Sequence, residues 1–139
     1  MTHRIEQPEW LRHTEPLPNK RALVVDDEAL IRWSVSETLA GLGLAVEQAV
    51  DAASTLDAVH AAPRPFDIVI LDLRLPDVDD LSLLESVRQR LPDATVVLMT
   101  AFGTPEIVAR AHELGVAGVL NKPFELAELA RLVQGAAEL

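Results

Sequence analysis

Hydrophobic residues along the chain follow two alternating spacings from residue 20 onward. Short apolar runs rich in β-branched residues predict five strands, at residues 22–25, 45–50, 66–71, 95–99 and 118–120. Between these runs, apolar residues recur at the three- and four-residue spacing of a helix with one buried face. The helical stripes are Ile31, Val35, Leu39 and Leu42; Leu81, Leu84, Val87 and Leu91; Ile107, Ala111 and Leu114; and Leu126, Leu129, Leu132 and Val133.

Two further segments carry helix-start signals. Residues 52–61 have a weaker helical pattern, and Asp51 before them is a plausible N-cap. The triplet Thr104, Pro105 and Glu106 offers a cap, a first-turn proline and an acid near the positive end of the helix. Strands and helices are therefore predicted to alternate through five βα units.

This alternation predicts the fold class. Nearly continuous apolar strands are typical of a parallel sheet that is buried on both faces and connected by right-handed crossovers. We therefore predict an α/β domain with a doubly wound parallel sheet and helices on both faces. In such sheets the functional groups lie at the carboxyl ends of the strands.

Residues 1–19 differ from the rest of the chain. They include Pro8, Pro16 and Pro18 and show no sustained hydrophobic period. We predict a flexible N-terminal tail over residues 1–19 and one folded domain over residues 20–139. A short docking element at Trp10 and Leu11 is an alternative for part of the tail.

Composition and charge narrow the functional classes. The 139 residues include no cysteine, which excludes disulfides, thiolate zinc sites and cysteine nucleophiles. Acids outnumber bases 22 to 12, and the resulting net charge of −10 disfavours direct nucleic-acid binding. No apolar run approaches the roughly 18 residues that span a bilayer, and the start of the chain lacks a signal segment. We therefore expect a soluble, cytoplasmic protein without membrane contact.

Polar residues stand at the ends of four predicted strands. Asp26 and Asp27 follow the first strand, Asp72 the third, Thr100 the fourth and Lys122 the fifth. Two carboxylates about 4 Å apart repel by roughly 4 kcal/mol at an effective dielectric near 20. A single aspartate at a strand end is often only a helix cap, but this whole set meets at one edge of a parallel sheet. A hard divalent cation such as Mg²⁺, with the lysine, offsets the repulsion.

These residues lie in motifs of a known family. In order and spacing, VVDDE, DIVILDLRLPD, VVLMTAFGTPE and GVLNKPF resemble the receiver domain of bacterial two-component response regulators. The resemblance extends over about residues 20–138 and implies a flavodoxin-like (βα)5 fold with strand order 2-1-3-4-5. The segments MTAFGTPE and NKPFEL are similar to receivers found ahead of ATPase and DNA-binding domains. Whether the chain is free-standing or part of a longer regulator is left open.

The resemblance assigns chemical roles. It implies that Asp72 is the phosphoacceptor, which takes a phosphoryl group from the phosphohistidine of a histidine kinase. Thr100 corresponds to the hydroxyl that moves to bond the phosphoryl oxygen, and Lys122 to the lysine that pairs with the phosphoryl group. The bond from Lys122 into Pro123 is implied to be cis.

The resemblance also implies a Mg²⁺ site. Asp27 and Asp72 are the implied direct side-chain ligands, the backbone carbonyl of Arg74 is the third protein ligand, and Asp26 acts through water. Phosphoryl transfer needs an in-line nucleophile and neutralised equatorial oxygens, which Asp72, the cation and Lys122 supply.

The implied function is a phosphorylation-dependent signalling switch. Such a protein is not an enzyme, although it takes part in its own phosphorylation and dephosphorylation. The implied partners are a sensor histidine kinase or phosphotransfer protein, and an output domain or second copy bound through the fourth helix, fifth strand and fifth helix.

Two positions depart from the family pattern. Asp80 stands where the family often has glycine, and aspartate tolerates a left-handed turn better than most residues. Val119 stands three residues before Lys122, where the family usually has a tyrosine or phenylalanine that reports phosphorylation. A stiff, β-branched valine cannot swing in that way. We expect the segment 101–106 to transmit the signal instead.

Three other functions are alternatives to this switch. A receiver-like module that binds partners without phosphorylation is the main alternative, although such modules typically lose one of Asp27, Asp72 or Lys122. A magnesium-dependent phosphatase with an aspartate nucleophile needs a second aspartate two residues later, where Arg74 stands. A flavin carrier needs a hydroxyl- and glycine-rich loop after the first strand. The histidines show no metal-ligand spacing and are expected on the surface, and Trp33 is expected to serve packing.

Overall fold

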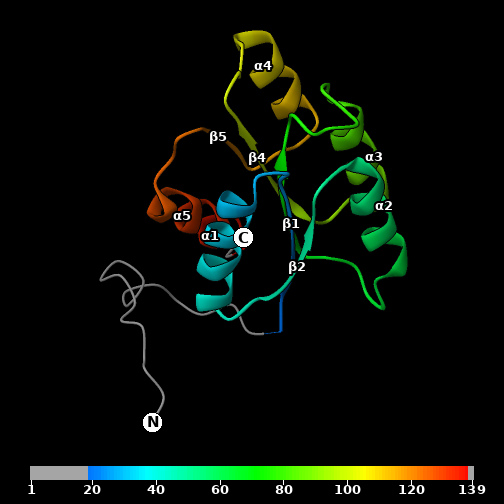
Figure 1. The fold of residues 1–139 in the computed structure, drawn as a ribbon, viewed down its shortest axis with the longest axis vertical. Helices are drawn as coiled ribbons and strands as arrows, with labels where there is room; N and C mark the ends of the chain where they lie inside the picture. The colour runs from blue at the N-terminus through cyan, green and yellow to red at the C-terminus, as the bar shows by residue number, and fades with distance from the viewer. Residues whose placement is uncertain (1–18, 138–139) are drawn as a thin grey trace.

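The computed structural model describes residues 19–137, in which strands and helices alternate along the chain (Figure 1). The predicted tail, including Trp10 and Leu11, lies almost entirely outside these residues, so the boundary at residue 20 stays a prediction. The elements are β1 (Arg21–Val25), α1 (Ala29–Gly41), β2 (Ala45–Ala49), α2 (Ala52–Ala61), β3 (Ile68–Asp72), α3 (Ser82–Arg90), β4 (Thr95–Thr100), α4 (Pro105–Glu113), β5 (Gly118–Asn121) and α5 (Leu126–Ala137).

The five strands form one parallel sheet in the order β2-β1-β3-β4-β5. In the register of this sheet, Leu71 of β3 lies opposite Val25 of β1 and Leu98 of β4. The predicted fold class and strand order are confirmed. All carboxyl ends of the strands consequently lie at one edge of the sheet.

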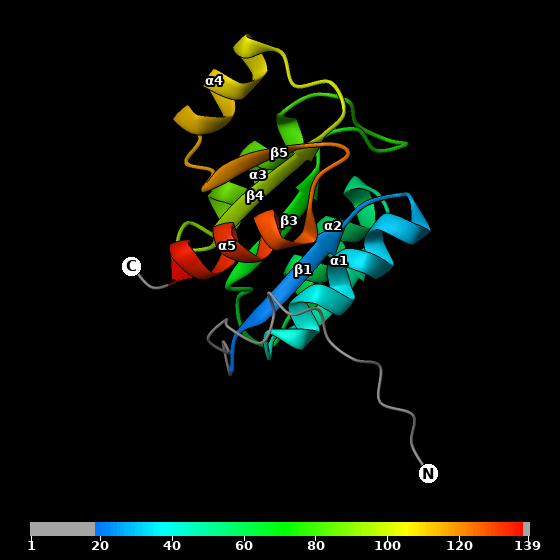
Figure 2. The same cartoon turned by 90° about the vertical axis from the view of Figure 1, so that its left-hand side faces the viewer.

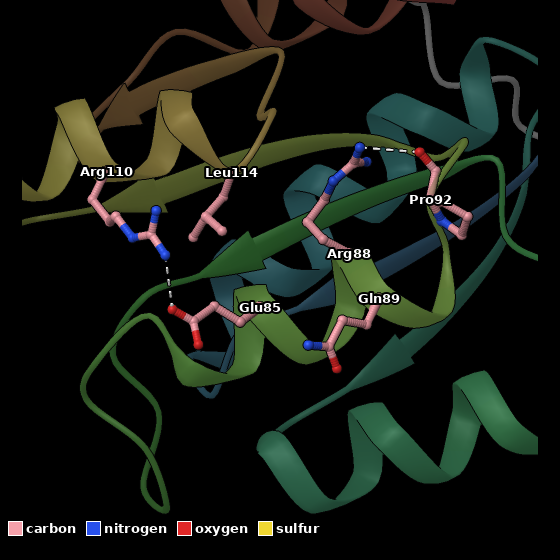
Figure 3. A pocket seen from close by; sticks show the side chains of 6 residues that line it. All are labelled: Glu85, Arg88, Gln89, Pro92, Arg110 and Leu114. Atoms are coloured by element: carbon pink, nitrogen blue, oxygen red, sulfur yellow. Dashed lines mark hydrogen bonds and ion pairs between the residues drawn. The ribbon is translucent and has the colours of Figure 1, made fainter.

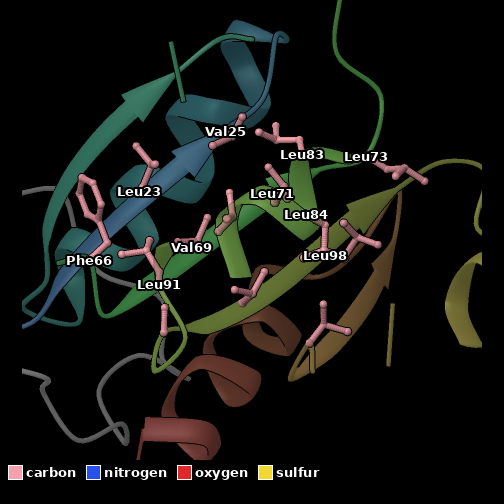
Figure 4. Close-up of a cluster of buried hydrophobic side chains, with 14 of the residues drawn as sticks. Leu23, Val25, Phe66, Val69, Leu71, Leu73, Leu83, Leu84, Leu91 and Leu98 are labelled. Atoms are coloured by element: carbon pink, nitrogen blue, oxygen red, sulfur yellow. The ribbon is translucent and has the colours of Figure 1, made fainter. Parts of the chain in front are cut away.

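Two apolar layers cover the sheet, because successive side chains of a strand point to opposite faces. Helices α1 and α5 cover one face and α2 and α3 the other, on the two sides of the sheet in Figure 1 and again in Figure 2. Under α1 and α5, strand residues such as Val24 and Ile70 pack with Val35 and Leu129. The opposite core, drawn in Figure 4, contains Leu23, Val25, Val69, Leu71, Leu84 and Leu98.

Strand β2 differs from the prediction of a strand buried on both faces. Only Ala49 of its five residues is buried, whereas Ala45, Glu47 and Gln48 are exposed. The reason is its place at the edge of the sheet, where it pairs with β1 alone. The third strand also begins at Ile68 rather than at residue 66 and extends to Asp72.

The predicted helix caps are present. The Asp51 carboxylate accepts a hydrogen bond from the Ser54 amide at 2.7 Å, and the Ser54 hydroxyl accepts one from the Asp51 amide at 3.2 Å. At the start of α4, the Thr104 hydroxyl accepts a hydrogen bond from the Ile107 amide at 3.2 Å. Within residues 19–137, no helix has the length and apolar character needed to cross a membrane.

Two expectations for single residues were wrong. Trp33 is 58% exposed on α1 and belongs to neither hydrophobic core. Asp80 does not adopt a left-handed turn, because Asn19 is the one non-glycine residue with positive φ in the described chain. The Asp80 carboxylate instead accepts a hydrogen bond from the Ser82 amide at 2.9 Å, at the start of α3. His60 and His112 are exposed as expected, while His3 and His13 lie outside the described residues.

Candidate functional site

The sheet edge brings the predicted charged residues together around the ammonium group of Lys122. Its Nζ donates to Asp26 Oδ2 at 2.8 Å and to Asp72 Oδ2 at 3.1 Å. Both carboxylates are buried, because Asp26 directly follows β1 and Asp72 is the last residue of the central strand β3. Lys122 also reaches Glu28 Oε1 at 3.5 Å. Residues up to 96 positions apart in the sequence thus form one ionic cluster.

Three of the acids form a group that fits a divalent cation. Asp26, Asp27 and Asp72 each offer a carboxylate oxygen, and these oxygens lie within 4.8 Å of one another. Both oxygens of Asp26 have partners, since Oδ1 accepts from the Glu28 amide at 2.8 Å and Oδ2 from Lys122. Asp27 is exposed, and no side-chain contact is recorded for it within residues 19–137. Hard oxygen ligands of this kind suit Mg²⁺ or Ca²⁺.

Burial changes the acidity of the two central groups. Desolvation, followed by the charge of Asp26, raises the pKa of Asp72, and Lys122 with the Arg74 amide offsets this only in part. Burial on its own lowers the pKa of Lys122. The hydrogen bond to Asp26 and the charges of Asp72 and Asp26 outweigh it, so that the pKa lies above its usual value. The ionised carboxylate of Asp72 is therefore held in an unfavourable state in the protein alone.

Thr100 lies at the same edge, at the end of β4, and is buried. Its hydroxyl accepts a hydrogen bond from the Phe102 amide at 3.0 Å. The exposed Phe102 ring in turn lies 4.2 Å from the guanidinium carbon of Arg74, in a cation–π contact. The Arg74 amide donates to Asp72 Oδ1 at 3.1 Å. The loops after β3 and β4 are therefore connected beside the acidic group.

The remaining predicted residues lie on β5 and just after it. The peptide bond between Lys122 and Pro123 is cis, as the resemblance implies. Val119 pairs with Leu98 in the sheet and is partly buried against the core under α2 and α3. The role of Val119 in place of the family's aromatic residue stays a prediction.

Sequence reasoning missed three residues that contact this edge. Glu28 binds both Asp26 and Lys122, Arg32 donates to the backbone carbonyl of Asp26 at 2.8 Å, and Asp77 accepts from the amides of Ala52 and Ala53 at 2.8 and 3.0 Å. The i, i+2 spacing of Asp26 and Glu28 is a local signal for the first contact. Arg32 and Asp77 act on backbone groups of other elements, which no local pattern indicates.

A separate surface pocket lies between α3 and α4 (Figure 3). Arg110 of α4 reaches Glu85 of α3 at 3.5 Å, and Arg88 donates to the Pro92 carbonyl at 3.0 Å. The ionic groups of this pocket are exposed and include none of the predicted site residues. It is a groove between two helices rather than part of the acidic group.

Comparison with known families decides the identity of the domain. The family described as the response regulator receiver domain matches residues 22–134. The chain belongs to the response regulator receiver domains. These domains are phosphorylation-dependent switches of two-component signalling, and signalling rather than catalysis is their general role. An acidic pocket that binds a divalent metal is common to them, and Asp26, Asp27 and Asp72 form such a pocket here.

Individual relatives agree with this assignment. The receiver domain is similar to the DNA-binding transcriptional regulator NtrC of Escherichia coli K12, with 36% identity over 113 residues, or 81% of this chain and 24% of NtrC. The chain thus spans about a quarter of the length of this relative.

Solved structures agree with the fold. The non-phosphorylated HemR receiver domain from Leptospira biflexa is 30% identical with a TM-score of 0.79, over 87% of this chain and 96% of that one. A Burkholderia pseudomallei response regulator with a phosphorylated aspartic acid, a calcium ion and citrate is 26% identical with a TM-score of 0.76, over 86% of this chain and 70% of that one.

Proposed function

We propose that this receiver domain accepts a phosphoryl group on Asp72 from the phosphohistidine of a histidine kinase or phosphotransfer protein. The observation that carries the proposal is the buried Asp72 carboxylate at the end of the central strand, 3.1 Å from Lys122 Nζ and next to Asp26 and Asp27. A nucleophile with a fixed cation at its side meets the main requirement of phosphoryl transfer. The protein takes part in its own phosphorylation but turns over no separate substrate.

The proposed metal is Mg²⁺, which supplies positive charge to the phosphoryl oxygens when it is bound. Asp27 and Asp72 would hold it directly, together with the backbone carbonyl of Arg74. The occupied oxygens of Asp26 support an indirect role through water, because Glu28 and Lys122 already use both of them. The exposed Asp27 carboxylate, without a recorded side-chain partner in residues 19–137, supports a direct one.

The transfer step follows from these positions. A carboxylate oxygen of Asp72 attacks the phosphorus in line with the imidazole nitrogen of the donor. The new O–P bond forms as the N–P bond breaks. The electron pair of the N–P bond stays on the imidazole nitrogen, which then takes up a proton. Lys122 stabilises the phosphoryl oxygens, and the Thr100 hydroxyl turns to donate to one of them.

Phosphorylation by a small donor tests this assignment. Wild type and Asp72→Asn are treated with acetyl phosphate and MgCl₂, and their intact masses are measured. We expect one added phosphoryl group in wild type and none in the variant. Asp79→Asn, an exposed acid of the same loop, is the matched control and should react like wild type. An equal mass gain in the Asp72 variant contradicts the assignment, and no gain in wild type favours the phosphorylation-independent binding module.

Signal transmission is proposed to use the segment 101–106 rather than Val119. The Phe102 amide is bonded to the Thr100 hydroxyl, so a turn of that hydroxyl changes the start of this segment. Val119 is short and β-branched with a restricted χ1, so we expect it to respond little. Amide chemical shifts with and without beryllofluoride measure the response. We expect the largest changes at residues 102–106, and a maximum at 118–120 with a silent 102–106 segment contradicts the proposal.

The surface beside the acidic group supports docking of a protein phosphodonor in the cytoplasm. Leu30 and Trp33 of α1 are exposed large hydrophobic residues, and a mostly apolar groove runs from Leu30 to Pro123 and Phe124. An output domain or a second copy is proposed to contact α4, β5 and α5. The net charge of −10 does not support direct nucleic-acid binding by this chain.

A further inference from the structure

Arg32 of α1 links the turn after β1 to the edge strand. Its Nη1 donates to the backbone carbonyl of Asp26 at 2.8 Å, and its Nε donates to Gln48 Oε1 at 3.0 Å. No carboxylate partner of Arg32 is recorded within the part of the chain that the structure describes. The guanidinium therefore uses two nitrogens to bind two acceptors, one in the turn after β1 and one in β2.

The carbonyl that Arg32 holds belongs to the peptide group between Asp26 and Asp27. Because this group is planar, fixing its oxygen also fixes the orientation of the Asp27 amide and limits where the Asp27 side chain points. Asp26 is held independently, by its amide on the Ala49 carbonyl at 3.2 Å and by its side-chain contacts. Asp27 has only its backbone to position it among the described contacts.

We propose that Arg32 is a positioning residue for the divalent cation, acting by orienting Asp27 through the Asp26 carbonyl. This inference rests on the proposed role of Asp27 as a direct ligand. Arg32 touches neither the cation nor the phosphoryl group. Contacts of this indirect kind typically change metal affinity about 10- to 100-fold when they are removed.

Positioning and charge predict opposite effects of removing Arg32. The positive charge of Arg32 repels a cation bound at the three carboxylates. If charge were the only effect of Arg32, removing it would strengthen metal binding. Loss of the contact to the Asp26 carbonyl releases Asp27 and weakens binding. A variant without the guanidinium therefore separates the two explanations by the sign of the change.

The test titrates MgCl₂ into Arg32→Met, Arg32→Lys and wild type and follows the amide chemical shifts of Asp27, Glu28 and Arg74. We expect Arg32→Met to bind Mg²⁺ about tenfold more weakly than wild type. Arg32→Lys keeps the charge but has one nitrogen in place of the planar fork, so we expect a smaller loss. Arg64→Lys is the matched control, because Arg64 also donates to a backbone carbonyl, that of Asn19. Asn19 precedes β1 and lies at the amino ends of the strands, away from the acidic group.

Spectra without metal give a second readout. The Asp27 and Glu28 amides should shift in Arg32→Met and stay unchanged in Arg64→Lys, while thermal unfolding verifies that each variant is folded. Unchanged or stronger Mg²⁺ binding by Arg32→Met overturns the inference. If Arg32→Met binds Mg²⁺ more weakly than wild type but acetyl phosphate adds no phosphoryl group to wild type, the proposed function fails while the role of Arg32 stands. If wild type shows no response to MgCl₂, both fail.

Discussion

Two clusters in this receiver domain bring a basic side chain between acids at similar distances. In the Lys122 cluster, Nζ lies 2.8, 3.1 and 3.5 Å from oxygens of Asp26, Asp72 and Glu28. In the Arg110 cluster, the guanidinium lies 3.1 and 3.5 Å from oxygens of Glu113 and Glu85. The distances alone do not distinguish a functional site from an ordinary surface.

Exposure distinguishes the clusters. The Lys122 side chain is 11% exposed and its two nearest partners are buried, whereas the Arg110 side chain is 50% exposed and its partners are open to solvent. Exposed ion pairs contribute about 0–1 kcal/mol, while removing one partner of a buried pair costs about 3–5 kcal/mol. Ion pairs of similar length are therefore expected to contribute much more to stability in the buried Lys122 cluster than in the exposed Arg110 cluster.

Replacing Lys122 gives the largest expected effect. Lys122→Met leaves Asp26 and Asp72 buried without a cation, so the free energy of unfolding at neutral pH should fall by about 3 kcal/mol. This value lies at the lower end of the range because the exposed Asp27 side of the cluster admits water. Urea unfolding in EDTA measures it. This decrease in the free energy of unfolding should become smaller in acid as the carboxylates take up protons. A decrease of less than about 1 kcal/mol at neutral pH would show that the Lys122 cluster contributes no more than exposed ion pairs do.

Magnesium should distinguish the clusters next. Asp27→Ala removes a proposed direct ligand and should weaken Mg²⁺ binding by at least the roughly tenfold that is typical for loss of a contact that only orients a ligand. Glu113→Gln removes an acid of the Arg110 cluster and should leave Mg²⁺ binding unchanged. Amide chemical shifts during a MgCl₂ titration measure both affinities. We expect weak binding even in wild type, because few protein groups hold the ion and Mg²⁺ keeps much of its water. Equal affinities in wild type and Asp27→Ala contradict direct ligation.

The pH dependence of stability gives a third contrast. Because the pKa of Asp72 is raised in the folded state, its ionisation costs stability as the pH rises from the ordinary aspartate value through the raised one. Asp72→Asn lacks this cost and leaves Lys122 paired with Asp26 and Glu28, so without metal it should be more stable than wild type at neutral pH. The difference should vanish below about pH 3.9, where unfolded aspartate is protonated. Urea unfolding in EDTA across this range measures it, and a variant less stable at pH 7 contradicts the expected sign.

The sequence was sufficient to predict three of the four residues of the Lys122 cluster, all but Glu28, for a simple reason. Asp26, Asp72 and Lys122 stand at strand ends, and a parallel sheet brings all such ends to one edge. Other features could not be predicted from the sequence, also for physical reasons. The exposure of β2 depends on its position at the edge of the sheet, which periodicity does not encode. The contacts of Arg32 and Asp77 depend on backbone groups that only the folded chain brings near.

Arg110 provides the smallest expected effect. Arg110→Met removes two exposed ion pairs, so the free energy of unfolding should change by less than about 1 kcal/mol. The methionine keeps an apolar stem over the groove between α3 and α4, which limits any packing loss. Urea unfolding in low and high salt separates the contribution of the ion pairs from that of packing. Screening at about 1 M salt should remove the difference in free energy of unfolding between wild type and variant. A salt-independent loss as large as that of Lys122→Met would show that the Arg110 cluster is held as firmly as the acidic site, and that exposure does not separate the two.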